Sequence, residues 1–142
     1  MIVDANLLLY AVDERSPFHE RSLEWLTAVL NGTRRVAIPW MSLVAFMRIS
    51  TNLRATDRPL SPSQAAGFVR DWLAAALVWT PAPGPRHVEI VLDLVEDGQL
   101  SGNLISDAHL AAMAIEHGLV LASNDSDFSR FEGLRWENPL SR

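Results

Sequence analysis

Four aspartates stand where an α/β fold would bring carboxylates together. Asp4 ends the first predicted strand, Asp125 and Asp127 follow a later one, and Asp107 stands in the first turn of a predicted helix. Ligands of open α/β sheets bind beyond the carboxyl ends of the strands. Carboxylates gathered there repel one another unless a cation lies among them, and hard divalent ions such as Mg²⁺ or Mn²⁺ suit oxygen ligands. The four residues therefore predict a shared metal site.

Each aspartate also has an ordinary interpretation. Asp107 follows Ser106, a predicted helix cap, where the positive end of the helix dipole alone favours a carboxylate. Asp125 and Asp127 lie in a predicted loop, where aspartates commonly form turns. Asp4 is harder to explain in this way, because an acid that ends a buried strand adds little to solubility. The metal site rests on all of them meeting in space.

The elements that must position these side chains alternate along the chain. Strands are predicted at 1–4, 36–38, 77–80, 119–122 and 134–136, and helices at 17–30 and 40–50, from the capping box at 61–64, after the turn at 81–85, and at 106–117. Strands that alternate with helices indicate a mainly parallel sheet covered on both faces. We therefore predict a three-layer α/β/α fold with four to five central strands, formed by one domain over residues 1–142.

Composition excludes several classes of protein. The chain has 142 residues and no cysteine, which excludes a disulfide framework, a thiolate zinc site and a cysteine nucleophile. No apolar run is long enough for a membrane span, and the first residues do not resemble a signal peptide. We therefore expect a cytosolic protein.

Charge is unevenly distributed along the chain. All 12 basic residues are arginine, and the net charge is −5. Five arginines face one acid between residues 34 and 58, a balance of +4, whereas one arginine faces eight acids between residues 86 and 127, a balance of −7. These two halves suit a cation site beside a rim that contacts phosphate. The candidates for contacting phosphate are Arg48, Arg54, Arg58 and Arg86.

Four segments resemble, in order, the motifs of PIN-domain ribonuclease toxins of the VapC kind. They are MIVDANLLLY at 1–10, NLISDAHLAAMA at 103–114, SNDSDF at 123–128 and FEGLRW at 131–136. Each motif is weak by itself, but the ordered set is specific and extends along the whole chain. The resemblance implies a PIN-like fold and cleavage of RNA.

The resemblance also implies roles for individual residues and partners. Asp4, Asp107 and Asp125 would be metal ligands, Asp127 a ligand directly or through water, and Asn6 a polar neighbour that orients ligands or phosphate. Mg²⁺ or Mn²⁺ would activate water for attack on the phosphodiester bond. The products would carry 5′-phosphate and 3′-hydroxyl ends. The partners would be the RNA substrate, a cognate antitoxin protein and a second copy in a homodimer.

The sequence departs from the family pattern at one place. Family members commonly carry a glutamate in the helix after the second strand, within a Glu-Phe-Leu-Arg type of sequence, but here the matching residues are AFMR at 45–48. Ala45 therefore replaces the fourth acid. We expect weaker metal binding than in four-acid relatives, with Ser42 or water in the glutamate's place.

Two other functions compete with a ribonuclease. A phosphoaspartyl protein also places an aspartate after its first strand, but it normally needs a lysine near the phosphoryl group, and this chain has none. The second is a catalytically weak or inactive PIN-like module that binds RNA or antitoxin without cleavage. Loss of RNA cleavage on Asp4→Ala would exclude the second.

Overall fold

The computed structural model describes residues 1–141, which form short strands between helices. The strands are β1 (Ile2–Val3), β2 (Val36–Ala37), β3 (Val78–Trp79), β4 (Leu121–Ala122) and β5 (Trp136–Glu137). The helices are α1 (Ala5–Val12), α2 (His19–Leu30), α3 (Trp40–Ser50), α4 (Pro62–Ala74), α5 (His87–Gly98), α6 (Asn103–His117) and the short 3-10 helix η1 (Ser126–Arg130).

The five strands form one parallel sheet in the order β3-β2-β1-β4-β5. Ile2 of the central strand lies opposite Ala37 on one side and Leu121 on the other. The chain builds outward from β1 to β3 and then returns to the other side of β1 with β4. The crevice between the ends of β1 and β4 is therefore the point at which the strand order reverses, where folds of this type bind ligands.

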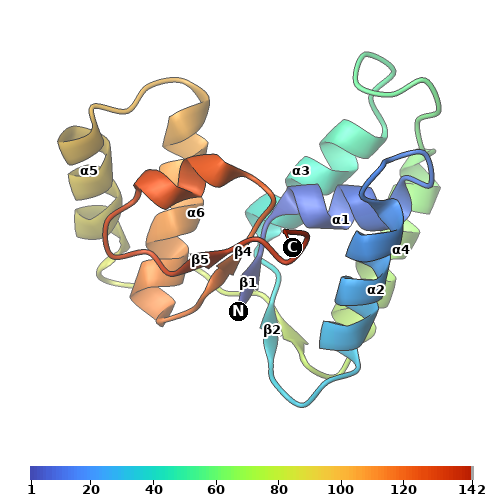
Figure 1. Cartoon of the computed structure of the whole chain (residues 1–142), viewed down its shortest axis with the longest axis horizontal. Coiled ribbons are helices and arrows are strands. Elements are labelled where there is room, and N and C mark those ends of the chain that lie inside the picture. The colour runs from blue at the N-terminus through green and yellow to red at the C-terminus, as the bar shows by residue number, and fades with distance from the viewer. Residues whose placement is uncertain (142) are drawn as a thin grey trace.

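Helices cover both faces of the sheet (Figure 1). α1 to α4 lie on one side, where Leu8, Phe46 and Trp72 belong to one buried apolar cluster. α5 and α6 lie on the other side, where Met113 and Phe128 belong to a second cluster. The predicted three-layer α/β/α fold with a parallel sheet is confirmed.

The helix α1 is not among the elements predicted from the sequence. Asp4 caps this helix through its side chain, whose Oδ1 accepts a hydrogen bond from the Ala5 backbone N–H at 2.7 Å. The cap satisfies one of the backbone donors that a helix start leaves unpaired. The first strand is also shorter than predicted and ends at Val3.

The start of α6 is a second correction. The helix begins at Asn103 after Gly102, whose φ of +59° suits glycine, and not at Ser106. Asp107 is therefore the fifth residue of the helix and has no place in its first turn. The helix dipole therefore does not explain why an aspartate stands at position 107. The predicted stop is confirmed at Gly118, which has a left-handed φ of +67°.

Other predicted elements differ only at their ends. The second helix starts at His19, two residues later than predicted, because Ser16 Oγ accepts from the Phe18 backbone N–H and forms a local turn before it. The capping box at Ser61 and Gln64 forms as predicted, with both of its hydrogen bonds. Within residues 1–141, every helix is too short or too polar to span a bilayer.

Candidate metal centre at the carboxyl edge of the sheet

Three carboxylates meet at the carboxyl edge of the sheet. Asp107 comes from α6, while Asp125 and Asp127 come from the segment after β4. One side-chain oxygen of each lies within 4.8 Å of the others. Asp125 is fixed by capping η1, since its Oδ1 accepts from the Asp127 backbone N–H at 2.9 Å. Two segments far apart in sequence therefore converge on one small acidic cluster.

Asp4 stands beside this cluster and is joined to it through Ser123. The Ser123 hydroxyl, which is fully buried, donates to Asp4 Oδ2 at 2.7 Å. Ser123 Oγ also accepts hydrogen bonds, from the Asp125 backbone N–H at 3.0 Å and from Asn6 Nδ2 at 3.1 Å. A hydroxyl has one donor and two acceptor sites, and all three are in use here. Ser123 thus locks the ends of β1 and β4 together.

Asn6 closes the same network from α1. Its Nδ2 donates to Ser123 Oγ, and its Oδ1 accepts from the Asn124 backbone N–H at 3.3 Å. The Asn124 side chain in turn accepts from Asn138 Nδ2 at 2.9 Å. Asn6 therefore lies where the resemblance implied a polar neighbour of the ligands, and its visible contacts hold the loop that carries Asp125.

The electrostatics of the cluster are those of a site with too much negative charge. Burial, followed by repulsion from Asp125, Asp4 and Asp127, raises the pKa of Asp107 to about 6. Burial also raises the pKa of Asp4, although the hydrogen bonds from Ser123 and Ala5 oppose the rise. Burial and neighbouring negative charge both make the ionised carboxylates less favourable here, and a bound cation would stabilise them.

The donors fit a hard divalent cation. All are carboxylate oxygens, they lie close enough to share one ion, and Mg²⁺ and Mn²⁺ prefer such ligands. Asp107, Asp125 and Asp127 would hold the ion. Asp4 lies next to them, and each of its oxygens accepts one hydrogen bond and keeps a further lone pair, so its role as a metal ligand stays a prediction.

Ser42, the residue predicted to fill the place of the missing glutamate, has a structural contact. It is buried, and its hydroxyl donates to the Val3 backbone carbonyl at 2.8 Å, so it ties α3 to the end of β1. A role for Ser42 in orienting ligands or substrate stays a prediction. Ala45 lies one turn later on α3 and is half-buried, on the helix side that faces the end of β1.

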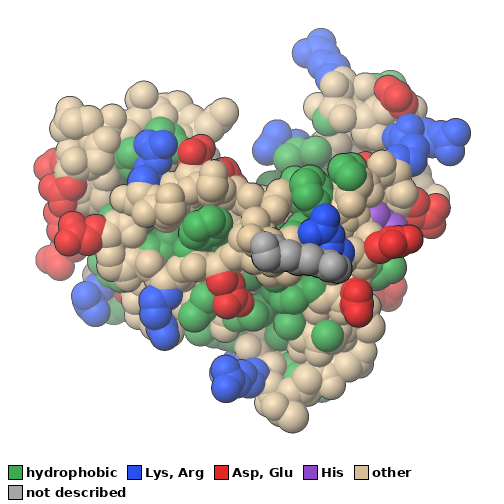
Figure 2. Space-filling view, viewed as in Figure 1, with side chains coloured by type: hydrophobic (Ala, Val, Ile, Leu, Met, Phe, Trp, Pro, Cys, Tyr) green, Lys and Arg blue, Asp and Glu red, His purple; other side chains and the backbone are tan. Residues whose placement is uncertain are grey.

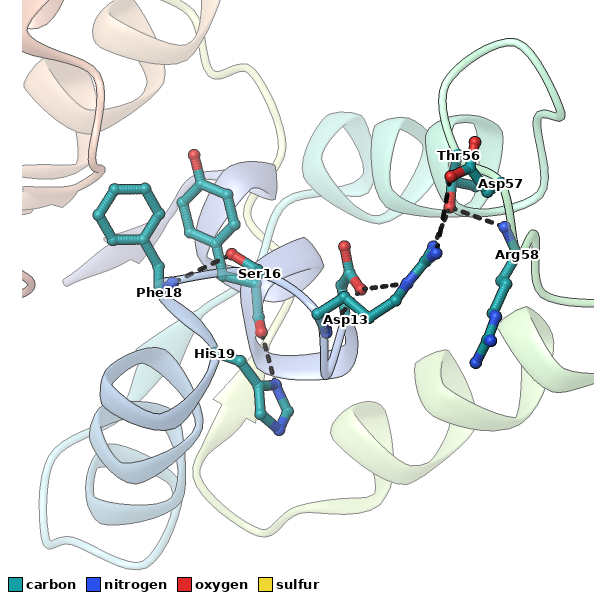
Figure 3. A network of polar contacts seen from close by, with 9 residues as sticks. Asp13, Ser16, Phe18, His19, Thr56, Asp57 and Arg58 are labelled. Carbon is teal, nitrogen blue, oxygen red and sulfur yellow. Dashed lines mark hydrogen bonds and ion pairs between the residues drawn. The ribbon is translucent and has the colours of Figure 1, made fainter.

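The four predicted RNA-binding arginines are exposed. Arg48 is in the last turn of α3, and Arg54 and Arg58 lie in the segment between α3 and α4. Arg58, whose backbone N–H donates to Thr56 Oγ1, borders a cavity on the α1 side of the molecule (Figure 3). Arg86 lies at the start of α5. None of the four forms an ion pair with a carboxylate of the acidic cluster in residues 1–141.

Arg130 is the basic residue that sequence reasoning missed. Its Nη2 lies 3.6 Å from Asp127 Oδ1, one turn away on η1, and its charge lowers the pKa of Asp107. Ser123 was missed as well, although it stands inside one of the recognised motifs. Only their positions in the sequence could have indicated these two residues. Ser123 directly follows the predicted fourth strand, and Arg130 stands three residues after Asp127.

Comparisons with known proteins found similarity over nearly the whole chain. A family model described as the PIN domain matches residues 1–134. Ribonuclease VapC37 of Mycobacterium tuberculosis is 46% identical over 138 residues, which cover 97% of this chain and 96% of that protein.

Solved structures share the fold at low sequence identity. VapBC2 from Rickettsia felis, bound to a DNA fragment from its promoter, has a TM-score of 0.67 at 20% identity and covers 96% of both chains. A toxin–antitoxin complex from Klebsiella pneumoniae has a TM-score of 0.64 at 18% identity, covering 97% of this chain and 96% of the other.

Proposed function

Because the chain belongs to the PIN-domain family, we propose that it is a divalent-metal-dependent endoribonuclease and the toxin of a toxin–antitoxin pair. The observation that carries the proposal is the meeting of Asp107, Asp125 and Asp127 within 4.8 Å at the crevice between β1 and β4. The similarity to a protein named a ribonuclease supplies the substrate class.

The chain's own residues have distinct roles in this proposal. Asp107, Asp125 and Asp127 hold the ion, and Ser123 keeps Asp4 and the backbone of Asp125 in register. When bound, Mg²⁺ or Mn²⁺ activates water for attack and offsets charge on the phosphate oxygens. Attack by water needs no 2′-hydroxyl, so the preference for RNA comes from recognition of its shape and loops. The products carry 5′-phosphate and 3′-hydroxyl ends.

The partners follow from the relatives. The Klebsiella structure is a toxin–antitoxin complex, and we propose an antitoxin protein as the partner of this chain as well. A homodimer is proposed on the family resemblance. Action on cellular RNA would take place in the cytoplasm, where a bacterial cell keeps its RNA.

A second candidate function is a PIN-like module that binds RNA or antitoxin without cutting. One observation favours it: α3 contributes no acid, since Ala45 stands at the family's glutamate position and Ser42 bonds to Val3. The cluster then consists of three aspartates with Asp4 beside them, and it lacks the glutamate that family members commonly carry.

Purified protein incubated with total RNA decides between the two functions. We expect fragments with 5′-phosphate ends in Mn²⁺ or Mg²⁺, none in EDTA, and a loss of at least a hundredfold in rate for Asp125→Asn. Asp71→Asn is the matched control, because it removes the same charge from an exposed position on α4. Intact RNA with the wild-type protein would exclude a nuclease, and cleavage that persists in Asp125→Asn would place the chemistry elsewhere.

A further inference from the structure

Arg130 is set apart from the other arginines by its place at the acidic cluster. Among residues 1–141, its contact with Asp127 is the one ion pair that a carboxylate of the cluster makes. At 3.6 Å from Nη2 to Oδ1 the contact is longer than a hydrogen bond, and both side chains are about half exposed. Such a pair contributes little free energy and separates easily.

The backbone beneath this pair is held firmly. Asp125 caps the start of η1, and Phe128 within η1 is 1% exposed and packs on Phe131 with ring centroids 5.9 Å apart. Asp127 and Arg130 therefore project from an anchored turn, three residues apart, with side chains free to move. Arg130 can change its partner without any change in the fold.

A divalent cation and the Arg130 guanidinium compete for the same carboxylate. The cation would use an oxygen of Asp127, and its two charges would repel a guanidinium at this distance. The displaced guanidinium would stay within one side-chain length of the ion. This is where the phosphate of a bound nucleic acid must lie, and guanidinium groups bind phosphate oxygens through paired N–H donors.

We infer that Arg130 is a displaceable counter-ion, which pairs with Asp127 in the metal-free protein and binds a phosphate of the RNA once a divalent cation occupies the cluster. The inference rests on the proposed function and deepens it, since it adds a substrate-binding residue to the site. It also gives the order of events: the cation binds first and makes the phosphate contact available.

The first test titrates Mg²⁺ alone by calorimetry. Arg130→Gln should bind Mg²⁺ about threefold to tenfold more tightly than the wild type, because a competing positive charge is gone. Arg130→Lys should stay near the wild-type value. Arg70→Gln, which removes an exposed arginine from α4, is the matched control and should change nothing. If Arg130 only supported the structure of η1, its loss would weaken Mg²⁺ binding, and that result would overturn the inference.

The second test follows RNA. Arg130→Gln should raise KM for RNA cleavage about tenfold with a smaller change in kcat, and lower the slope of log affinity against log salt by about one. Arg130→Lys should restore part of the loss. An unchanged KM would contradict the phosphate contact. If the wild type does not cut RNA, the proposed nuclease function fails, but RNA affinity in Mg²⁺ measured by fluorescence anisotropy applies the same test to Arg130.

Discussion

Two acidic regions of the molecule differ in how their charge is balanced. At the carboxyl edge of the sheet, Asp127 forms an ion pair with Arg130, while Asp107 and Asp125 form none. On the α1 side, Asp13 and Asp57 both lie within 4.0 Å of Arg15, and Asp13 and Arg15 line a cavity of about 670 Å³ (Figure 3). Both carboxylates of the second region therefore have a cationic partner within the chain, whereas two of the three in the first region have none.

The surrounding hydrogen bonds follow the same division. Arg15 also donates to Thr56 Oγ1 at 3.2 Å, so its network joins two loops and serves the fold. The acids of α5 form a third case, since Glu89, Asp93, Glu96 and Asp97 are exposed and need no partner (Figure 2). Acidic residues by themselves thus say little. A cation site is indicated where several acidic side chains converge in a half-buried place and lack basic residues to pair with.

The largest expected effect on stability comes from Ser123→Ala. The change leaves Asp4 Oδ2, Asn6 Nδ2 and the Asp125 N–H without their partner in a buried place. We expect the free energy of unfolding to fall by about 2 kcal/mol and RNA cleavage to fall at least tenfold. Chemical denaturation and cleavage rates measure the two effects.

Ser126→Ala is the control for this change, because Ser126 is an exposed serine in η1. Equal behaviour of the two variants would show that the hydroxyl of Ser123 does not hold the acidic edge together.

A glutamate at the family's usual position should sharpen the contrast between the regions. Ala45→Glu adds an acid on the side of α3 that faces the end of β1, and we expect Mg²⁺ affinity to rise about tenfold in calorimetry. Val44→Glu adds the same charge on the neighbouring face, where Val44 is 52% exposed, and should have much less effect. Unchanged affinity in Ala45→Glu would mean that this part of α3 does not lie at the metal site.

The raised pKa of Asp107 predicts a pH dependence of stability in the metal-free protein. A carboxyl with a pKa of about 6 in the folded state and 3.8 when unfolded binds more protons when folded between these values. The free energy of unfolding therefore falls as pH rises from about 4 to 6. Asp107→Asn removes this fall, and after allowance for solvent exposure it should be more stable than wild type by about 1 kcal/mol at pH 7.5.

Thermal melts in EDTA across this pH range measure the difference. Added Mg²⁺ should reverse the order of the two proteins, since it stabilises the wild type by binding. A wild type that becomes more stable between pH 4 and 6, relative to Asp107→Asn, would contradict the raised pKa of Asp107.

The smallest effect is expected on the α1 side. Arg15→Gln breaks two exposed ion pairs, which contribute at most about 0.5 kcal/mol each, and one exposed hydrogen bond to Thr56. Mg²⁺ affinity should stay the same, because the cavity region is separate from the acidic edge. A large change in Mg²⁺ binding, measured by calorimetry, would show that the two regions are coupled.

The sequence by itself determined the parallel sheet and the edge at which chemistry would be found. Alternating apolar runs, the capping box at Ser61 and the stop at Gly118 are local signals, and residues a few positions apart produce them. The motifs placed Asp4 and Asp125 beyond the ends of two predicted strands, and the structure shows that these strands, β1 and β4, are neighbours. Their roles as metal ligands stay a prediction.

Only the tertiary structure decided the contacts between distant segments. Ser123 meets Asn6 across 117 positions, and Ser42 meets Val3 across 39, so no local pattern could reveal that one hydroxyl joins the site while the other serves the fold. The start of α6 at Asn103 likewise showed that Asp107 lies outside the first turn, so the helix dipole does not explain its position. Periodicity records which face of a segment is buried, but the partner that a polar side chain meets there depends on the packing of the whole chain.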